Sequence, residues 1–233
     1  MPIRVGLLAE GNDHLILVAF LAKLLGVAEE ELLADVIDGQ GHGWQYVERT
    51  VDRALRRFYG GCAQLAILSM DDDGDLDLIK VGGSEDPKHP RHWLHAADGP
   101  KPGCRWCLVK GLAEKTRPHL NWIPQKPGDG WPIVIALPVE SIEAWLLTTQ
   151  AIVSPGSGSL HAEREARSTF KLRFYRRPAA TRTDVETVAL PMIRQLSHDQ
   201  LQVLGDHSTS FKHFAGEVDR FREEIQTAPD CWS

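Results

Sequence analysis

The stretch RVGLLAEG at residues 4–11 carries the strongest structural signal in the chain, because an apolar strand pattern runs directly into an acidic residue and a glycine. The stretch LAILSMDDDGD at residues 65–75 repeats this arrangement, with an apolar run that ends in aspartates. In a parallel sheet the carboxyl ends of the strands share one edge, where ligands of open α/β folds bind. Carboxylates that converge there repel one another unless a cation lies between them. Because oxygen ligands without neighbouring Cys or His favour Mg²⁺ or Mn²⁺ over zinc, we expect one of these ions at this edge.

Apolar strand patterns and helical patterns alternate on both sides of these stretches. The expected elements after the first strand are a helix at about 12–25, a strand at 33–38, a helix at 44–58, strands at 62–70 and 132–138, and a helix at 140–148. This alternation predicts an α/β fold with a mostly parallel sheet of about four strands, flanked by helices on both faces.

The remaining sequence predicts one domain over residues 1–233 with a long insertion and a helical C-terminal part. The insertion, about residues 76–131, is rich in Gly, Pro, His and Trp and shows little periodicity. The C-terminal region, about residues 160–228, ends in a helix with an apolar stripe formed by Phe211, Phe214, Val218, Phe221 and Ile225. Pro191 lies inside a helical pattern, so the helix boundaries between 184 and 205 stay open.

Composition excludes several classes of protein. The chain has 233 residues and a net charge of -6, which argues against a globally basic nucleic-acid binder. It begins with a strand pattern rather than a signal peptide, and it lacks the run of about 18 apolar residues that a membrane span needs. Four cysteines fit a reducing compartment, so the cytoplasm is the expected location.

The acidic motifs resemble those of a known family. Glu10-Gly11 followed by Asp-x-Asp-Gly after a later strand resembles the Toprim catalytic domain of topoisomerases, primases and the overcoming-lysogenization-defect nucleases. The stretch PVESIEAWLL at 138–147 resembles the E-x-W-L-L helix of small Toprim-like proteins in bacterial anti-phage loci, and STSFKHF at 208–214 resembles their S-F-x-x-F helix start. The resemblance covers residues 3–75 and 132–225 and implies a Toprim-like (Rossmann-like) fold.

The resemblance also implies a catalytic metal site. Glu10, Asp71 and Asp73 would hold one or two Mg²⁺ or Mn²⁺ ions and form the catalytic set, with Glu10 in general acid–base work. Such ions neutralise the charge that builds up on the attacking and leaving oxygens of a phosphodiester. Glu143, on the first turn of its helix, is expected to complete the metal shell, with Glu140 as the competing residue. Because three aspartates follow one another at residues 71–73, the sequence leaves open which of them face the metal site.

The insertion carries a second set of metal-ligating residue types. Cys-x-x-Cys in a Pro- and Gly-rich loop, with histidines nearby, suits a tetrahedral structural zinc, which would also hold such a segment in one shape. The expected ligands are His92, His95, Cys104 and Cys107, with His89 or His119 as substitutes. The alternative is a loop with solvent-facing histidines and two unpaired cysteines.

A local basic stripe is a candidate nucleic-acid contact on this acidic protein. Between His161 and Arg182 seven basic residues face only two acidic ones: Arg164, Arg167, Lys171, Arg173, Arg176, Arg177 and Arg182 against Glu163 and Glu165. The residues expected to bind nucleic acid are Lys171, Arg173, Arg176 and Lys212. The alternative is an ordinary solvated helix face.

These features together predict a Mg²⁺-dependent Toprim-like nuclease that cleaves nucleic acid, with DNA as the expected substrate. The resemblance implies a component of a bacterial anti-phage defence system and a neighbouring ATPase as its partner. One alternative is a non-catalytic Toprim-fold subunit that docks on the ATPase. A further alternative is a haloacid-dehalogenase-type phosphatase, whose signature also places Asp-x-Asp-Gly after an apolar strand. The Glu-Gly unit that precedes the signature here argues against the phosphatase.

Overall fold

The computed structural model describes residues 2–9, 12–39, 43–71, 99–101, 103–120, 132–138, 141–165 and 169–227. Its four strands are β1 (Ile3–Ala9), β2 (Leu32–Asp38), β3 (Leu65–Ser69) and β4 (Ile133–Ala136). They form one sheet in the order β2-β1-β3-β4, and every neighbouring pair is parallel. The predicted α/β fold with a parallel sheet of four strands is therefore confirmed.

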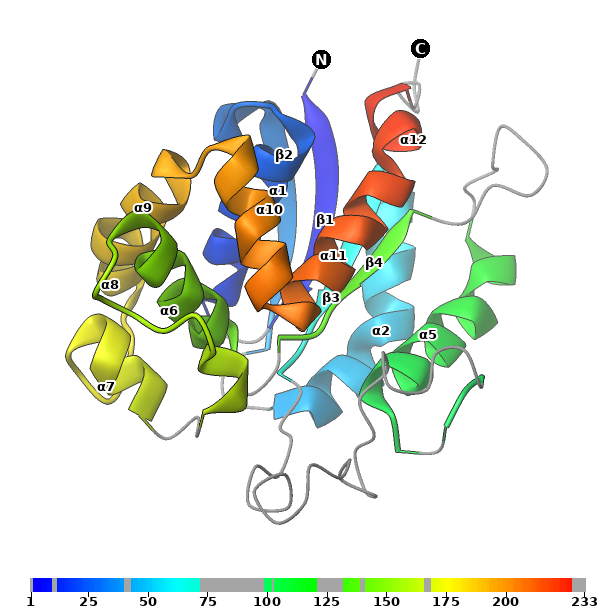
Figure 1. The fold of residues 1–233 in the computed structure, drawn as a ribbon. Helices are drawn as coiled ribbons and strands as arrows, with labels where there is room; N and C mark the ends of the chain where they lie inside the picture. Colours follow the sequence, from blue (N-terminus) through cyan, green and yellow to red (C-terminus); the bar gives the residue numbers. More distant parts are fainter. Residues whose placement is uncertain are drawn as a thin grey trace.

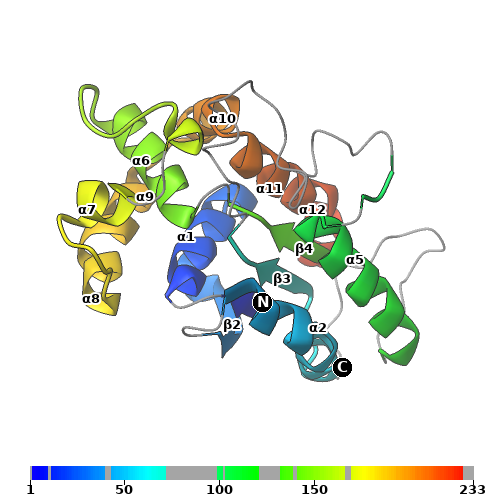
Figure 2. The same cartoon turned by 90° about the horizontal axis from the view of Figure 1, so that it is seen from below.

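Helices cover both faces of this sheet (Figure 1). The α-helices are α1 (Asp13–Leu25), α2 (Gly43–Gly60), α5 (Arg105–Thr116), α6 (Ile142–Val153), α7 (Phe170–Tyr175), α8 (Arg182–Asp184), α9 (Leu190–Gln195), α10 (His198–His207), α11 (Thr209–Arg220) and α12 (Arg222–Thr227). On one face α1, α6 and the C-terminal helices pack together, and on the other face α2 and α5 lie side by side (Figures 1 and 2).

The alternating side chains of the strands divide the core between these two faces. Leu7 of β1 and Ile67 of β3 pack with α1 and the C-terminal helices, whereas Leu8 and Leu68 pack with α2 and α5. Because successive strand residues point to opposite faces, strands that are apolar throughout must be buried on both sides. The central strand β3 is accordingly buried along its whole length.

Gly6 sets how closely α2 approaches the sheet. A Cβ atom built on Gly6 would lie 2.1 Å from Cγ of Phe58, much closer than two carbon atoms that are not bonded to each other can approach. Phe58 is itself 1% exposed, so its ring has no open space to move into. The glycine in the middle of β1 is therefore a packing requirement rather than a strand breaker.

The two helices that carry the family-like motifs contact each other in the core. The indole Nε1 of Trp145 on α6 donates a hydrogen bond of 2.6 Å to Oγ of Ser210, on the first turn of α11. The rings of Trp145 and Phe214 stack with their centroids 5.5 Å apart. These two motifs therefore form one buried contact across 65 residues of sequence.

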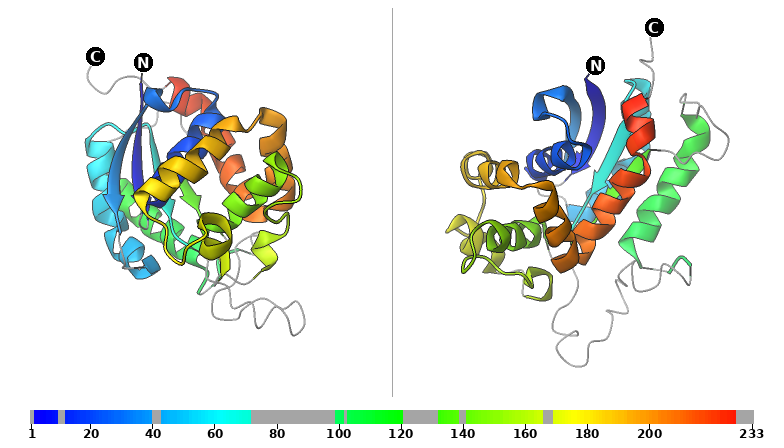
Figure 3. Two further views of the ribbon diagram at one scale, coloured as in Figure 1. Left: turned by 90° about the vertical axis from the view of Figure 1, so that its left-hand side faces the viewer. Right: turned by 45° about the horizontal axis from the view of Figure 1, so that its top comes forward.

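The side of β4 is covered by helices from both layers. α11 runs alongside β4, and α5 lies against it from the other face (Figure 3). The rings of Trp106 on α5 and His213 on α11 meet edge to face, with centroids 5.7 Å apart. A sheet edge covered in this way is protected from pairing with other strands.

Several expected boundaries differ from the structure. Cys62 has a left-handed backbone with φ of 65°, so the chain turns there and β3 begins only at Leu65. The expected final helix is two helices, α11 and α12, because the backbone changes direction at Phe221. The apolar stripe is nevertheless buried along both of them, as expected.

The segment around Pro191 continues as a helix instead of breaking. A π-helical turn over Val185–Ala189 follows α8 and leads into α9, in which Pro191 occupies the first turn. Proline lacks the N–H group that would bond one turn back, and the wider π turn accommodates that loss.

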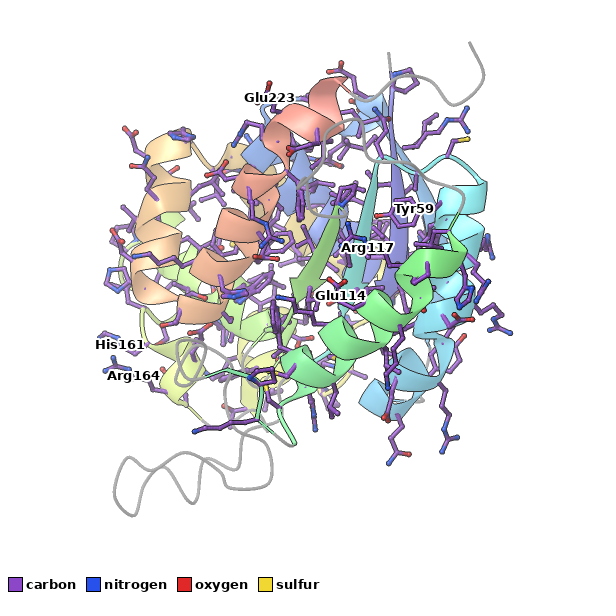
Figure 4. The ribbon with its side chains drawn as sticks, turned by 90° about the vertical axis from the view of Figure 1, so that its right-hand side faces the viewer. Tyr59, Glu114, Arg117, His161, Arg164 and Glu223 are labelled. Carbon is purple, nitrogen blue, oxygen red and sulfur yellow. The ribbon has the colours of Figure 1, made fainter. Side chains whose placement is uncertain are left out.

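Part of the insertion forms regular secondary structure, although its sequence shows little periodicity. Residues 105–116 form α5, followed by a 3₁₀ turn at Arg117–His119. Tyr59 of α2 supports the chain where it re-enters the sheet, because its hydroxyl donates a hydrogen bond of 2.8 Å to the carbonyl of Pro132 (Figure 4). Within the described ranges, no helix is long and apolar enough to cross a membrane.

Candidate active site at the carboxyl edge of the sheet

The parallel register brings the carboxyl ends of the strands to one edge, at the bottom of Figure 1 and facing the viewer in Figure 2. Ala9 of β1 is level with Asp38 of β2, and its carbonyl accepts a hydrogen bond of 2.8 Å from the N–H of Gly39. On the other side, the N–H of Met70 donates to the carbonyl of Ala136 over 3.2 Å. The chain thus leaves β1, β3 and β4 side by side at the edge where acidic residues were expected.

Asp71 lies at this edge, two residues beyond the end of β3, and is only 7% exposed. Its backbone carbonyl accepts a hydrogen bond from Nη1 of Arg105, the first residue of α5. Arg105 is 4% exposed, so the insertion brings a buried cation to the edge. Sequence reasoning missed this residue because it lies between the two cysteines that were interpreted as zinc ligands.

Glu143 is the second residue of α6, on its first turn as expected, and is 4% exposed. Its Oε1 lies 3.8 Å from Nζ of Lys171 on α7, whose own side chain is 45% exposed. A carboxylate this deeply buried is costly unless a positive charge lies close to it. The half-exposed ammonium group of Lys171 supplies such a positive charge and offsets part of the cost of burying the Glu143 carboxylate.

Asp13 and Tyr175 join Glu143 on the face of the sheet that α1 covers. Burial raises the pKa of the Tyr175 hydroxyl most, and the carboxylates of Glu143, Asp13 and Asp184 raise it further. These carboxylates therefore lie close enough to the phenol oxygen to affect its charge. Neither Asp13 nor Tyr175 was predicted from the sequence to belong to the site. The available signal for Tyr175 was its spacing of four residues from Lys171, which places both on one side of a helix.

Several predicted site residues lie outside the described residues. They are Glu10, Asp73, Glu140, His89, His92 and His95. The predicted cluster of Glu10, Asp71 and Asp73 and the choice between Glu140 and Glu143 therefore stay predictions.

Cys104 and Cys107 lie at the start of α5, not in a loop as expected. Cys104 caps the helix, and its Sγ accepts a long hydrogen bond of 3.5 Å from the N–H of Cys107. Burial raises the pKa of the Cys104 thiol to about 12, so the thiol is protonated at neutral pH. His119, one of the substitute zinc ligands, follows the far end of this 12-residue helix, about 18 Å along its axis. That distance excludes a shared zinc ion with Cys104, which corrects the expectation for His119.

In the part of the chain that the structure describes, no group of three or more His, Cys, Asp or Glu side chains is arranged to hold a metal ion. The zinc set of His92, His95, Cys104 and Cys107 includes two residues outside that part, so it stays a prediction.

The predicted nucleic-acid contacts have carboxylate neighbours in three of four cases. Besides Lys171 beside Glu143, Arg173 pairs with Glu165, and Nζ of Lys212 lies 4.0 Å from Oδ1 of Asp206. Arg176 is exposed and ends α7 with a left-handed backbone, φ 60°. The pairs of Lys171 and Arg173 lower the net positive charge of the basic stripe, which therefore presents a weaker field to a phosphate backbone.

Comparisons with models of known protein families, with curated proteins and with solved structures each gave no match.

Proposed function

We propose that the chain is a Mg²⁺-dependent nuclease of the Toprim-like type that cleaves phosphodiester bonds of DNA. The observation that supports this most is the burial of Asp71, at the carboxyl edge of the sheet just beyond β3, and of Glu143, on the first turn of the helix that follows the neighbouring parallel strand β4. Open α/β folds bind their ligands at this edge. Two buried acidic side chains there carry a desolvation cost that a divalent cation offsets.

The oxygen ligands at this edge fit Mg²⁺ better than a softer ion. Asp71 and Glu143, together with Glu10 and Asp73, are the residues that would hold it. When bound, Mg²⁺ neutralises negative charge on the phosphate and lowers the pKa of a coordinated water. Glu10 is the proposed general acid–base residue, as the family resemblance implies.

Two cations of this chain would bind a phosphate group near the carboxylates. Lys171 is half-exposed beside Glu143, so its ammonium group can bind a phosphate oxygen and still reach solvent. Arg105 is held at the edge by the Asp71 carbonyl and adds a second positive charge. Arg176, on the exposed surface after α7, would contact a neighbouring phosphate of a long substrate.

The proposed biological setting follows from the family resemblance alone. The small Toprim-like proteins that the motifs resemble occur in anti-phage loci, and we propose the same role here, with a neighbouring ATPase as the partner. Purification of the chain with and without such a subunit would test this setting, because stable association is the expected result.

A cleavage assay with matched carboxylate variants tests the enzymatic proposal. Supercoiled plasmid DNA is incubated with the protein and Mg²⁺ or Mn²⁺, and nicked and linear products are measured. We expect Asp71→Asn and Glu143→Gln each to slow cleavage by about 100-fold or more, because loss of a metal ligand removes several kcal/mol of transition-state stabilisation. The control is Asp206→Asn, whose carboxylate is 72% exposed and should leave the rate unchanged.

Three results would count against the proposed nuclease. Cleavage at the wild-type rate by both site variants would show that the carboxylates do not act in the reaction. Rapid turnover of p-nitrophenyl phosphate without DNA cleavage would favour the phosphatase. Association with the ATPase without metal-dependent cleavage, alone or together, would favour the non-catalytic subunit.

A further inference from the structure

Arg105 makes a buried hydrogen bond from the insertion to the carboxyl edge of the sheet. It is the first residue of α5, and its Nη1 donates to the backbone carbonyl of Asp71. Arg105 is 4% exposed and Asp71 is 7% exposed, so little water reaches this contact. A buried guanidinium group is costly unless its hydrogen bonds offset the loss of water, so the bond to Asp71 contributes more than one at the surface would.

This hydrogen bond acts on the chain at the point where it leaves the sheet. β3 ends at Ser69, and the N–H of Met70 still donates to the carbonyl of Ala136 over 3.2 Å. Asp71 is the next residue, and Arg105 holds its backbone from a helix 34 residues further along the chain. Because a single methylene group joins the Asp71 carboxylate to its backbone, a fixed backbone limits the carboxylate to a few positions.

Helix α5 is itself anchored, so it can hold Asp71 in a fixed place. It packs against α2 and β4 (Figure 2). Val109 is buried in the core on the α2 face of the sheet, and at the far end of α5 the Oγ1 of Thr116 donates a hydrogen bond of 3.0 Å to Oδ1 of Asp52 on α2. Arg105 therefore connects the candidate site to a packed helix, which positions a residue more accurately than a loop does.

We infer that Arg105 is a positioning residue: its guanidinium group holds the Asp71 backbone so that the carboxylate stays in place to bind the divalent cation. This inference rests on the proposed function, which makes Asp71 a ligand of Mg²⁺. It gives the insertion a task in the site, because the insertion supplies the hydrogen bond that fixes this ligand. Hydrogen bonds that orient metal ligands change metal affinity by about 10–100-fold.

The charge of Arg105 and its hydrogen bond have opposite effects on metal binding. A positive charge near a cation site repels the cation, so loss of the charge alone would strengthen the binding of a divalent ion. Loss of the hydrogen bond frees the Asp71 backbone and weakens that binding. The direction of the change in metal affinity therefore distinguishes a positioning residue from a charge that merely lies nearby.

The variants Arg105→Met and Arg105→Lys test the inference, with Mn²⁺ affinity measured by electron paramagnetic resonance in the absence of DNA. Without DNA, the positive charge that Arg105 would offer to a phosphate plays no part. The control is Thr116→Val, which removes the hydrogen bond to Asp52 at the other end of α5 and leaves the contact with Asp71 intact. Melting temperature and circular dichroism show which variants are folded.

We expect Arg105→Met to lower Mn²⁺ affinity by about 10-fold or more. Arg105→Lys keeps the charge and a shorter donor without the planar fork, so its affinity should lie between those of Arg105→Met and the wild type. Thr116→Val should lower the melting temperature and leave Mn²⁺ affinity unchanged. If Arg105→Met does not fold, the comparison of Arg105→Lys with the wild type decides the question.

Mn²⁺ affinity at or above the wild-type value in the folded Arg105 variants would overturn the inference. An equal loss of affinity in Thr116→Val would also overturn it, because that loss would be a general effect of a destabilised α5. Asp71→Asn separates the inference from the proposed function. Loss of Mn²⁺ binding in Asp71→Asn, with normal affinity in the Arg105 variants, would refute only the positioning role. Wild-type Mn²⁺ affinity in Asp71→Asn would refute the proposed metal site itself.

Discussion

Glu163 holds the N-terminus of α11 in place, and its replacement by alanine is the most informative stability test of the fold. The carboxylate is 7% exposed and accepts hydrogen bonds from Oγ of Ser208 at 2.7 Å and from the N–H groups of Thr209 and Ser210 at 2.8 and 3.1 Å. It also accepts from Oγ of Ser210, the same atom that accepts from Trp145. Glu163→Ala therefore removes the hydrogen bonds that join the segment after α6 to the start of α11, next to the contact between Ser210 and Trp145 of α6.

The expected loss in the free energy of unfolding is about 3 kcal/mol. A hydrogen bond to a charged group contributes about 1.5–3 kcal/mol, but the four bonds share one carboxylate and their energies do not add. Removal of a buried charge also returns part of its desolvation cost. For a chain of this length, about 3 kcal/mol corresponds to a fall of about 6–12 °C in melting temperature.

The assay is thermal unfolding followed by circular dichroism, supported by urea titration. Glu186→Ala serves as the control, because that carboxylate is 45% exposed and pairs with Arg182 one turn away. Surface pairs of this kind contribute about 0.3–0.5 kcal/mol. A melting temperature for Glu163→Ala within 2 °C of the Glu186→Ala value would refute the reasoning that the carboxylate holds these elements together.

Two further predictions concern packing and a buried thiol. Gly6→Ala should destabilise the protein by about 1–3 kcal/mol in urea titration, because its Cβ would collide with the ring of Phe58. Gly111→Ala is the control and should be neutral or stabilising by up to about 1 kcal/mol, since nothing lies within 4 Å of the added carbon and alanine favours a helix. Equal changes in the free energy of unfolding for the two variants would contradict the predicted collision with Phe58. The pKa of Cys104 is raised from 9.0 to about 12, so the folded state keeps a proton that the unfolded state loses, and stability should fall as pH rises from about 9 towards 12. At pH 8, iodoacetamide should modify the half-buried Cys107 before Cys104, and faster reaction at Cys104 would count against the shift.

The sequence predicted the order and type of the main elements because hydrophobic periodicity is a local property. The helix that ends at Gly26 is an example, since the glycine adopts the left-handed backbone that ends α1. Boundaries were less accurate where tertiary contacts act. Helix α5 was not predicted within the insertion because that segment shows little periodicity, yet Val109 and Ala113 are buried in the core on the α2 face of the sheet.

The candidate site was predictable only in part. The rule that parallel strands end at one edge placed Asp71 there, and the start of a helix after β4 placed Glu143 nearby. No rule of sequence spacing connects Arg105 with the Asp71 carbonyl, 34 residues away. Nor does one connect Tyr175 with Glu143, because their proximity depends on how α7 packs against α6.

The chain's own pattern of apolar and polar residues thus determined a parallel α/β sheet and the edge of that sheet at which Asp71 lies. Tertiary structure alone decided which side chains lie near Asp71 and Glu143: a buried arginine from the insertion near Asp71, and a lysine and a tyrosine from α7 near Glu143. The physical reason is that backbone periodicity is set by neighbours within a few residues, whereas the neighbours of a buried side chain are set by the packing of elements that are distant in sequence.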